Sequence, residues 1–210
     1  MADTSNLSGT RPYADAPRLP DDEPLDLRAL VGAGSRPVEL EIGPGRGWFL
    51  VERLEADPGA RVVGLEIRRK WASIVDERLE KRGLSDRGRV FAADARQVLP
   101  QLVPGTLSVV YIHFPDPWWK KRHAKRRVLT AELLSGVAGA LAPGGELFVQ
   151  TDVFDRAEQF ESVVAAEPRL APWSATARVE DNPYGARSPR ERRAIADGLP
   201  VLRLRYRRVG

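Results

Sequence analysis

An acidic residue between two prolines opens the most unusual stretch of this chain. Asp116 is flanked by Pro115 and Pro117, and each proline fixes its own φ and favours extended geometry in the residue before it. Two tryptophans follow, and six of the eight residues 120–127 are Lys or Arg. A rigidly held carboxylate, aromatic faces and a basic run predict a site for a base that belongs to a polyanion. The alternative interpretation is a turn with a solvated charged face.

Further acids coincide with the ends of the segments that we expect to be strands. Short apolar segments predict strands over residues 38–42, 61–66, 89–92, 107–113 and 146–151. The acids near their ends are Glu41, Glu66, Asp94, Asp116 and Asp152. In open α/β sheets, ligands lie beyond the carboxyl ends of the strands. We therefore expect these carboxylates to gather at one edge of the sheet.

A glycine-rich turn follows the first expected strand and precedes a helix. Gly43, Gly45 and Gly47 allow a ligand to approach the backbone closely. A dinucleotide fingerprint needs a further glycine where this chain has Trp48, which disfavours a nicotinamide oxidoreductase. Glu41 would repel a pyrophosphate but suits a cation, such as the amino group and sulfonium of S-adenosylmethionine. The alternative is an ordinary tight turn with Glu41 in a structural ion pair.

Two of the other acids have both a ligand interpretation and a structural one. Glu66 ends the second strand, where a carboxylate can accept hydrogen bonds from both ribose hydroxyls. Asp94 stands just before a helix that begins near Ala95, so it can simply be the N-cap of that helix. The two roles of Asp94 can coexist.

The remaining periodicity predicts an α/β fold with helices on both faces of a mostly parallel sheet. Helices are expected over residues 70–82, 130–141 and 153–167, and residues 142–145 are expected to form a turn. The residues expected to be buried on two of these helices are Trp71, Ile74, Val75 and Leu79, and then Val153, Phe154, Ala157, Phe160, Val163 and Val164. Residues 199–209 alternate apolar and basic side chains, and a weaker strand is expected within 174–180. Too few residues separate these two for a crossover helix, so we expect an antiparallel C-terminal strand.

Composition limits the class of protein. The 210 residues suit one domain, and a hydrophobic content of 42% is enough for a core. The net charge of +4 favours an anionic partner, and residues 117–131 contain no acid. The absence of cysteine and the presence of two histidines disfavour disulfides and a metal site. No apolar run approaches 18 residues, so we expect a soluble cytoplasmic protein with a flexible arm over residues 1–35 and one domain over 36–210.

The stretch from Phe114 to Arg127 resembles a known signature. Pro-Asp-Pro-Trp followed by a lysine, then Arg-His and a basic run, is similar to the signature of the bacterial tRNA (guanine-N7)-methyltransferases. The resemblance implies a Rossmann-like class I methyltransferase fold with a seven-stranded sheet. It also implies S-adenosylmethionine as methyl donor, tRNA as substrate and partner, and position 46 of the variable loop as the modified guanine. No metal or membrane partner is implied, and the chain would be a monomer or a homodimer.

The resemblance also implies roles for individual residues. Asp116 corresponds to the catalytic carboxylate. The positions that correspond to methyl-donor binding are Glu41, Gly43, Gly45, Glu66, Asp94, Ala95 and Asp116. The positions that correspond to substrate contacts are Lys120, Asp152, Ser188 and Glu191. The residues that would hold tRNA phosphates are Arg122, Lys125, Arg126 and Arg127.

One position departs from the pattern of that family. The family has Thr-x-Phe/Tyr-Glu where this chain has Ser188-Pro189-Arg190-Glu191, so an arginine replaces the aromatic residue. An arginine plane can also stack on a base. The alternative for this segment is a solvated charged helix. For the whole chain, the alternative function is a non-catalytic or differently targeted RNA-binding protein of methyltransferase fold.

Overall fold

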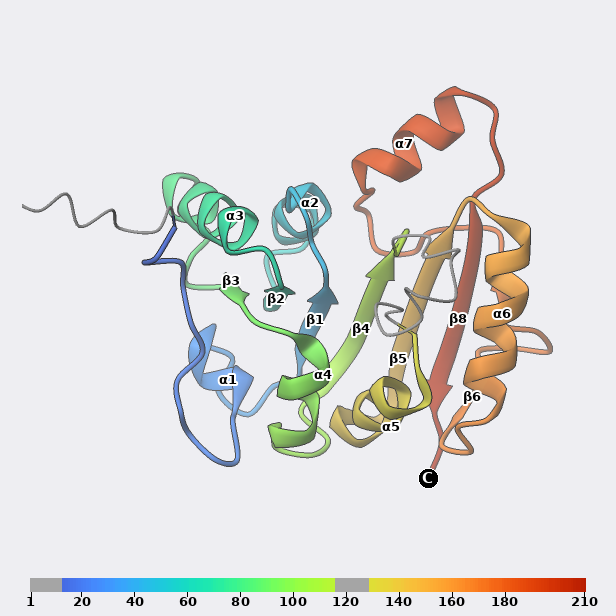
Figure 1. The fold of residues 1–210 in the computed structure, drawn as a ribbon, viewed down its shortest axis with the longest axis horizontal. Helices are drawn as coiled ribbons and strands as arrows, with labels where there is room; N and C mark the ends of the chain where they lie inside the picture. Colours follow the sequence, from blue (N-terminus) through green and yellow to red (C-terminus); the bar gives the residue numbers. More distant parts are fainter. Residues whose placement is uncertain (1–12, 116–128) are drawn as a thin grey trace, which may run out of the picture.

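The computed structural model describes residues 13–115 and 129–210, and a single mixed β-sheet forms its centre (Figure 1). The strands are β1 (Val38–Ile42), β2 (Val62–Glu66), β3 (Gly88–Ala92), β4 (Leu107–His113), β5 (Leu141–Thr151), β6 (Leu170–Pro172), β7 (Arg178–Val179) and β8 (Leu202–Arg208). Their order is β3-β2-β1-β4-β5-β8-β6, with β7 also paired to β8. The strands β1 to β5 pair in parallel with one another, and β8 is antiparallel to β5.

The predicted parallel sheet with an antiparallel C-terminal strand is therefore confirmed. The sheet has eight strands rather than seven, because the two-residue β7 pairs with β8 beyond the seven-strand path. Sequence periodicity did not detect β6, which is only three residues long. The strand β5 begins at Leu141 and includes residues 142–145, where we expected a turn. Leu107 of β4 pairs with Leu141, but Val109 pairs with Glu146. Residues 142–145 therefore interrupt the regular pairing of β5 with β4.

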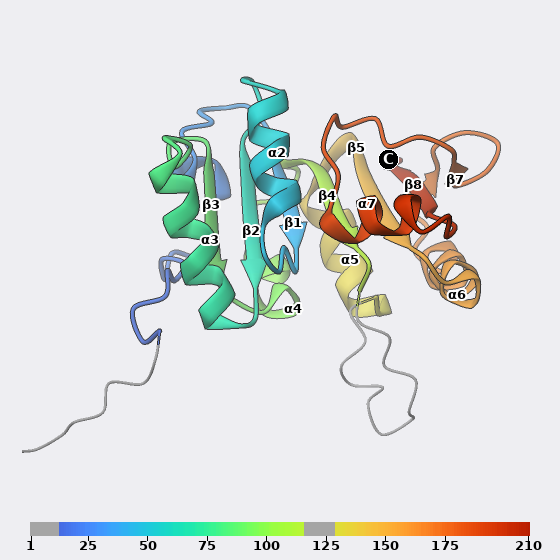
Figure 2. The ribbon, with the colours of Figure 1, turned by 90° about the horizontal axis from the view of Figure 1, so that it is seen from above.

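Helices cover both faces of the sheet (Figures 1 and 2). They are α1 (Leu27–Leu30), α2 (Trp48–Ala56), α3 (Arg69–Lys81), α4 (Ala95–Val98), α5 (Ala131–Ala140), α6 (Phe154–Ala165) and α7 (Pro189–Ala196), and a 3-10 turn over Leu99–Gln101 continues α4. Buried side chains of α1, α4, α5 and α6 form one core with the sheet, and those of α3 and most of those of α2 form a second core against β2 and β3. Phe49 of α2 belongs to a third, smaller cluster with Tyr111, Phe148 and Tyr184. Alternation along the strands explains why core residues lie on both sides of the sheet, because successive side chains point to opposite faces.

Two predicted helix faces differ from the structure in detail. In α3 the buried residues are Ala72, Val75 and Leu79, whereas Trp71 and Ile74 are half-buried. Trp71 lies instead near two cations, with Cζ of Arg46 5.4 Å from its ring centroid. In α6 the first helical residue, Phe154, is 55% exposed and does not belong to the buried face. The prediction for these side chains was wrong because the ends and edges of each helix lie beyond the contact with the sheet.

The N-terminal segment contributes to the fold. Leu25 and Leu27 are buried in the larger core, and the backbone N–H of Leu25 donates to the carbonyl of Gln101 at 2.8 Å. The N–H of Ala92, in β3, donates to the carbonyl of Pro17 at 2.7 Å. Residues 13–35 therefore pack against the domain, in contrast to the loose arm that we expected. Residues 1–12 lie outside the described residues.

Candidate functional site

The carboxyl ends of the parallel strands bring several predicted acids to one edge. Glu41 and Glu66 lie at the ends of β1 and β2, which pair in parallel with Glu41 opposite Gly64. Asp94 follows β3, and Asp152 follows β5. Figure 2 shows β2 and β3 running side by side towards this edge. The structure therefore places these four acids at or just beyond the carboxyl ends of β1, β2, β3 and β5.

The glycine turn between β1 and α2 adopts backbone conformations that other residues rarely adopt. Gly43, Gly45 and Gly47 have φ of 72°, 55° and 69°. A Cβ on Gly47 would lie 2.2 Å from Cγ1 of Val75, so this glycine allows α2 to approach α3. A Cβ on Gly43 would meet no atom within 4 Å. The turn is therefore closed by packing at Gly47 and open at Gly43, where a ligand can approach the backbone.

Glu66 ties this glycine turn to the end of β2. Its Oε2 accepts a hydrogen bond from the N–H of Gly45 at 2.9 Å, and its Oε1 accepts from the backbone N–H and from Nε of Arg68, at 2.9 and 3.2 Å. A carboxylate oxygen has two lone pairs, so Oε2 can accept one further hydrogen bond from a ligand hydroxyl, and donation by a second hydroxyl requires Nε of Arg68 to leave Oε1. The next residue, Ile67, is 66% exposed. Ile67 was not among the predicted site residues, although an isoleucine directly after a strand-end acid offers an apolar face beside that acid.

Glu41 forms a buried pair with His113 on the neighbouring strand. Nδ1 of His113 lies 3.0 Å from Oε1 of Glu41, and both side chains are almost fully buried. Glu41 therefore has a structural side-chain partner, as the alternative interpretation of this residue requires. However, Oε2 of Glu41 is buried and has no hydrogen-bond partner among the described residues. An unpaired buried carboxylate oxygen is costly, so it fits a ligand that brings a donor, above all a cationic one.

The row of unpaired polar atoms continues across the sheet. Nε2 of His113 and both side-chain amide atoms of Gln150 are also buried without a partner in the part of the chain that the structure describes. His113 in β4 is in register with Gln150 in β5. Glu41, His113 and Gln150 thus follow one another across three adjacent strands. Polar atoms of this kind in natural proteins are usually satisfied by a ligand, water or ion.

Asp94 begins α4 and is held by the second residue of that helix. Its Oδ1 accepts a hydrogen bond from the N–H of Arg96 at 3.0 Å, which is an N-cap, and the guanidinium of Arg96 also donates to it. This hydrogen bonding from Arg96 lowers the pKa of Asp94 below its ordinary value. Asp94 therefore stays ionised at neutral pH. The N-cap interpretation is confirmed, and Ala95 is the first residue of the helix.

Two of the predicted substrate residues, Ser188 and Glu191, lie at the start of α7 and have structural partners. Ser188 is the N-cap of α7, and its hydroxyl accepts from the N–H of Glu191 at 3.1 Å. Glu191 is 0% exposed. Its Oε1 accepts from Nη2 of Arg203 at 2.8 Å, and its Oε2 accepts from Nδ2 of Asn182 at 3.0 Å. The geometry of Ser188 and Glu191 therefore suits the positioning of α7.

The third residue of this group, Asp152, is bound by Arg190 from the first turn of α7. Nη2 and Nε of Arg190 both donate to Oδ2 of Asp152, at 2.6 and 2.9 Å. The residue that replaces the family aromatic thus faces a predicted substrate carboxylate. Sequence patterns did not predict this contact, because 38 residues separate the two partners.

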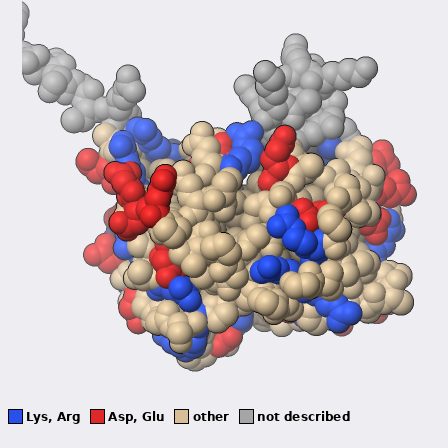
Figure 3. Space-filling model, turned by 90° about the horizontal axis from the view of Figure 1, so that it is seen from below, with Lys and Arg blue, Asp and Glu red and all other residues tan. Residues whose placement is uncertain are grey.

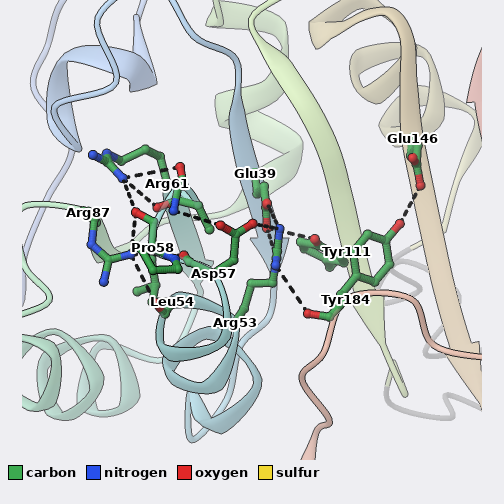
Figure 4. A network of polar contacts seen from close by, with 12 residues as sticks. Glu39, Arg53, Leu54, Asp57, Pro58, Arg61, Arg87, Tyr111, Glu146 and Tyr184 are labelled. Atoms are coloured by element: carbon green, nitrogen blue, oxygen red, sulfur yellow. Dashed lines mark hydrogen bonds and ion pairs between the residues drawn. The ribbon is translucent and has the colours of Figure 1, made fainter.

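A buried polar network fixes the segment that leads into α7 (Figure 4). Arg53 of α2 donates to both oxygens of Glu39, at 2.6 and 2.9 Å, and the hydroxyl of Tyr111 donates to Oε2 of Glu39 at 2.8 Å. Arg53 also donates to the carbonyl of Tyr184 at 3.4 Å, and the Tyr184 hydroxyl donates to Glu146 at 2.6 Å. Burial, with the nearby carboxylates, raises the pKa of both tyrosines. The network joins α2, β1, β4 and β5 to residue 184.

The most distinctive predicted residues lie outside the described residues. These are Asp116, Lys120, Arg122, Lys125, Arg126 and Arg127. Basic and acidic side chains of the described residues are interspersed on the face shown in Figure 3, and neither sign covers it. Within residues 13–115 and 129–210, no group of three or more His, Cys, Asp or Glu side chains could hold a metal ion. No helix in those ranges is long and apolar enough to cross a membrane.

Comparison with solved structures identifies the fold. A geranyl diphosphate C-methyltransferase from Streptomyces coelicolor, in complex with S-adenosyl-L-homocysteine, superposes with a TM-score of 0.57 over 87% of this chain and 77% of that chain, at 19% identity. The aminoglycoside resistance methyltransferase NpmB1 superposes with a TM-score of 0.53 over 83% of this chain and 88% of that chain, at 20% identity. At such low identities the similarity establishes a shared methyltransferase fold.

Comparison with curated sequences identifies the family. A family model described as "Putative methyltransferase" matches residues 35–204. A tRNA (guanine-N(7)-)-methyltransferase of Anaeromyxobacter dehalogenans is 40% identical over 91% of this chain and 94% of its own length. The protein of the same name from Myxococcus xanthus is 38% identical over 88% of this chain and 89% of its own length. The chain therefore belongs to the tRNA (guanine-N(7)-)-methyltransferase family.

Proposed function

We propose that this protein transfers the methyl group of S-adenosylmethionine to N7 of a guanine in tRNA. The observation that carries the proposal is the similarity, over most of the chain, to relatives named tRNA (guanine-N(7)-)-methyltransferase. The sheet edge supports it, because the acids there suit a cationic methyl donor. The finer proposal is that the guanine is position 46 of the variable loop, in a cytoplasmic protein that acts as a monomer or a homodimer.

The donor site would be built from the ends of β1, β2 and β3. The unpaired Oε2 of Glu41 would accept a hydrogen bond from the donor's amino group. The open side of the turn at Gly43 would admit the donor to the backbone. Glu66 would accept the ribose hydroxyls, and the exposed Ile67 would lie against the adenine. Asp94 and Ala95 at the start of α4 would contact the rim of the adenine.

The chemistry requires positioning more than proton transfer. When bound, S-adenosylmethionine supplies an activated methyl group on a sulfonium, and S-adenosylhomocysteine leaves as the neutral product. Guanine N7 carries an in-plane lone pair at neutral pH, so no general base is needed to expose it. The positive charge passes from sulfur to the purine ring, and carboxylates near the ring stabilise it. Asp116 would be this catalytic carboxylate, with Lys120 and Asp152 as substrate contacts.

The tRNA would bind through the basic run that follows Asp116. Arg122, Lys125, Arg126 and Arg127 would contact phosphates, which position the RNA without reading its sequence. Ser188 and Glu191 would act indirectly by placing α7, since their side chains bind within the protein.

The test is to incubate the full chain with a tRNA transcript and S-adenosylmethionine that carries a labelled methyl group. The nucleosides are then identified by mass spectrometry, and the position is mapped by cleavage at 7-methylguanosine. We expect one 7-methylguanosine per tRNA at position 46, and its loss in Asp116→Ala. Labelling at another atom or base, or full turnover by Asp116→Ala, would overturn the assignment.

A further inference from the structure

The ion pair between Arg190 and Asp152 occupies a carboxylate that the proposed function assigns to guanine. The guanidinium donates through Nε and Nη2 to Oδ2, at 2.9 and 2.6 Å. Among the described residues, no other side chain donates to Asp152. The carboxylate side chain is 13% exposed, whereas that of Arg190 is 63% exposed. The acid is therefore fixed in the sheet edge, and the arginine approaches it from solvent.

The donors of Arg190 resemble those of the expected substrate. A guanidinium presents neighbouring N–H groups in one plane, which match a carboxylate. The Watson–Crick edge of guanine presents N1–H and the exocyclic amino group in a similar planar arrangement. A carboxylate that accepts from one can accept from the other, but it cannot bind both with the same lone pairs.

We propose that Arg190 is a placeholder, a positioning residue that occupies Asp152 until the guanine of the substrate displaces it. This inference rests on the proposed function, because it assumes that Asp152 accepts hydrogen bonds from guanine. The placeholder holds the carboxylate of Asp152 in one orientation before the RNA arrives. It also makes guanine compete with a side chain of the protein itself, which lowers the apparent affinity for the RNA.

The exposure of Arg190 determines how strong this competition is. Ion pairs with one mostly solvated partner are weak and screened by salt. Such a pair would weaken the binding of guanine to Asp152 by about two- to fivefold. Arg190 lies in the first turn of α7, whose N-cap at Ser188 and buried Glu191 hold the helix in place. The guanidinium can therefore leave Asp152 by side-chain rotation alone, without movement of the helix.

The test compares Arg190→Met with a matched control on the same helix. Methionine keeps the apolar stem of arginine but removes the donors. Arg193 pairs with Asp197 one turn later and is 83% exposed. Arg193→Met therefore removes one positive charge from the same helix without touching the partner of Asp152. We would measure kcat and the KM for tRNA at low and at high salt, together with the thermal stability of each variant.

Arg190→Met is expected to lower the KM for tRNA by about two- to fivefold at low salt, with kcat within twofold of the wild type. The difference is expected to shrink at high salt, because salt screens the pair in the wild type. Arg193→Met is expected not to lower KM. An unchanged or increased KM in Arg190→Met would overturn the placeholder role and would assign Arg190 to the protein surface or to RNA binding. If the wild type itself formed no 7-methylguanosine, the proposed function would fail instead.

Discussion

Replacement of Glu191 by alanine is the perturbation that best separates a structural role from a substrate role. Glu191 is 0% exposed, and its partner Arg203 is 11% exposed at the side chain. The alanine variant leaves a buried guanidinium without its carboxylate, which costs about 3–5 kcal/mol. The whole free energy of unfolding of such a domain is about 5–15 kcal/mol. For a chain of this size, the loss corresponds to a fall in Tm of roughly 10 °C.

The assay is thermal unfolding followed by circular dichroism, with methyl transfer measured at a temperature where each variant is folded. The double variant Glu191→Ala/Arg203→Met removes both charges and is expected to recover part of the lost stability. Arg193→Ala on the same helix removes an exposed pair and is expected to change stability by less than about 0.5 kcal/mol. A Glu191→Ala variant with unchanged Tm but no activity would refute the reasoning, because the carboxylate would then act on the substrate.

Three further predictions concern the donor site and the buried tyrosines. Gly43→Ala is expected to weaken S-adenosylmethionine binding in calorimetry. The control is Gly34→Ala, at a glycine with a similar positive φ and equally open space, which is expected to lower stability but to leave S-adenosylmethionine binding unchanged. Ile67→Asp is expected to weaken donor binding with little change in Tm, because its side chain is exposed; unchanged binding would exclude the adenine contact. Burial raises the pKa of Tyr111 and Tyr184 above the ordinary 10.0. Unfolding above pH 10 therefore releases protons. In urea titrations, the free energy of unfolding should fall by about 1.4 kcal/mol per pH unit for each tyrosine. In Tyr184→Phe this fall with pH should be smaller.

The sheet edge could be predicted from the sequence because two local signals coincide there. Each parallel strand is a short apolar run, and the acid after it marks its carboxyl end. The positions of Glu41, Glu66, Asp94 and Asp152 follow once the strands are parallel, since parallel strands end at the same edge. The N-cap role of Asp94 was also predictable, because it depends only on the two residues that follow it.

The partners of these acids could not be predicted, because they depend on contacts between distant segments. Glu41 meets His113 across 72 residues, and Asp152 meets Arg190 across 38 residues. No periodicity in the sequence indicates such pairs. The packing of residues 13–35 was missed for a related reason. Leu25 and Leu27 are isolated apolar residues in a polar, proline-rich segment, and only the completed core shows where they fit.

The most direct test of the account is calorimetric titration of S-adenosylmethionine into the wild type, Glu41→Gln and Glu39→Gln. Both glutamates lie in β1 on the same face of the sheet, but Glu39 is satisfied by Arg53 and Tyr111, whereas Oε2 of Glu41 has no partner in the described part of the chain. A hydrogen bond to a charged group contributes about 1.5–3 kcal/mol. We expect Glu41→Gln to raise the Kd by roughly 10- to 100-fold and Glu39→Gln to leave it close to the wild-type value. Equal Kd values for the wild type and Glu41→Gln would contradict a donor site built on the acids of this edge.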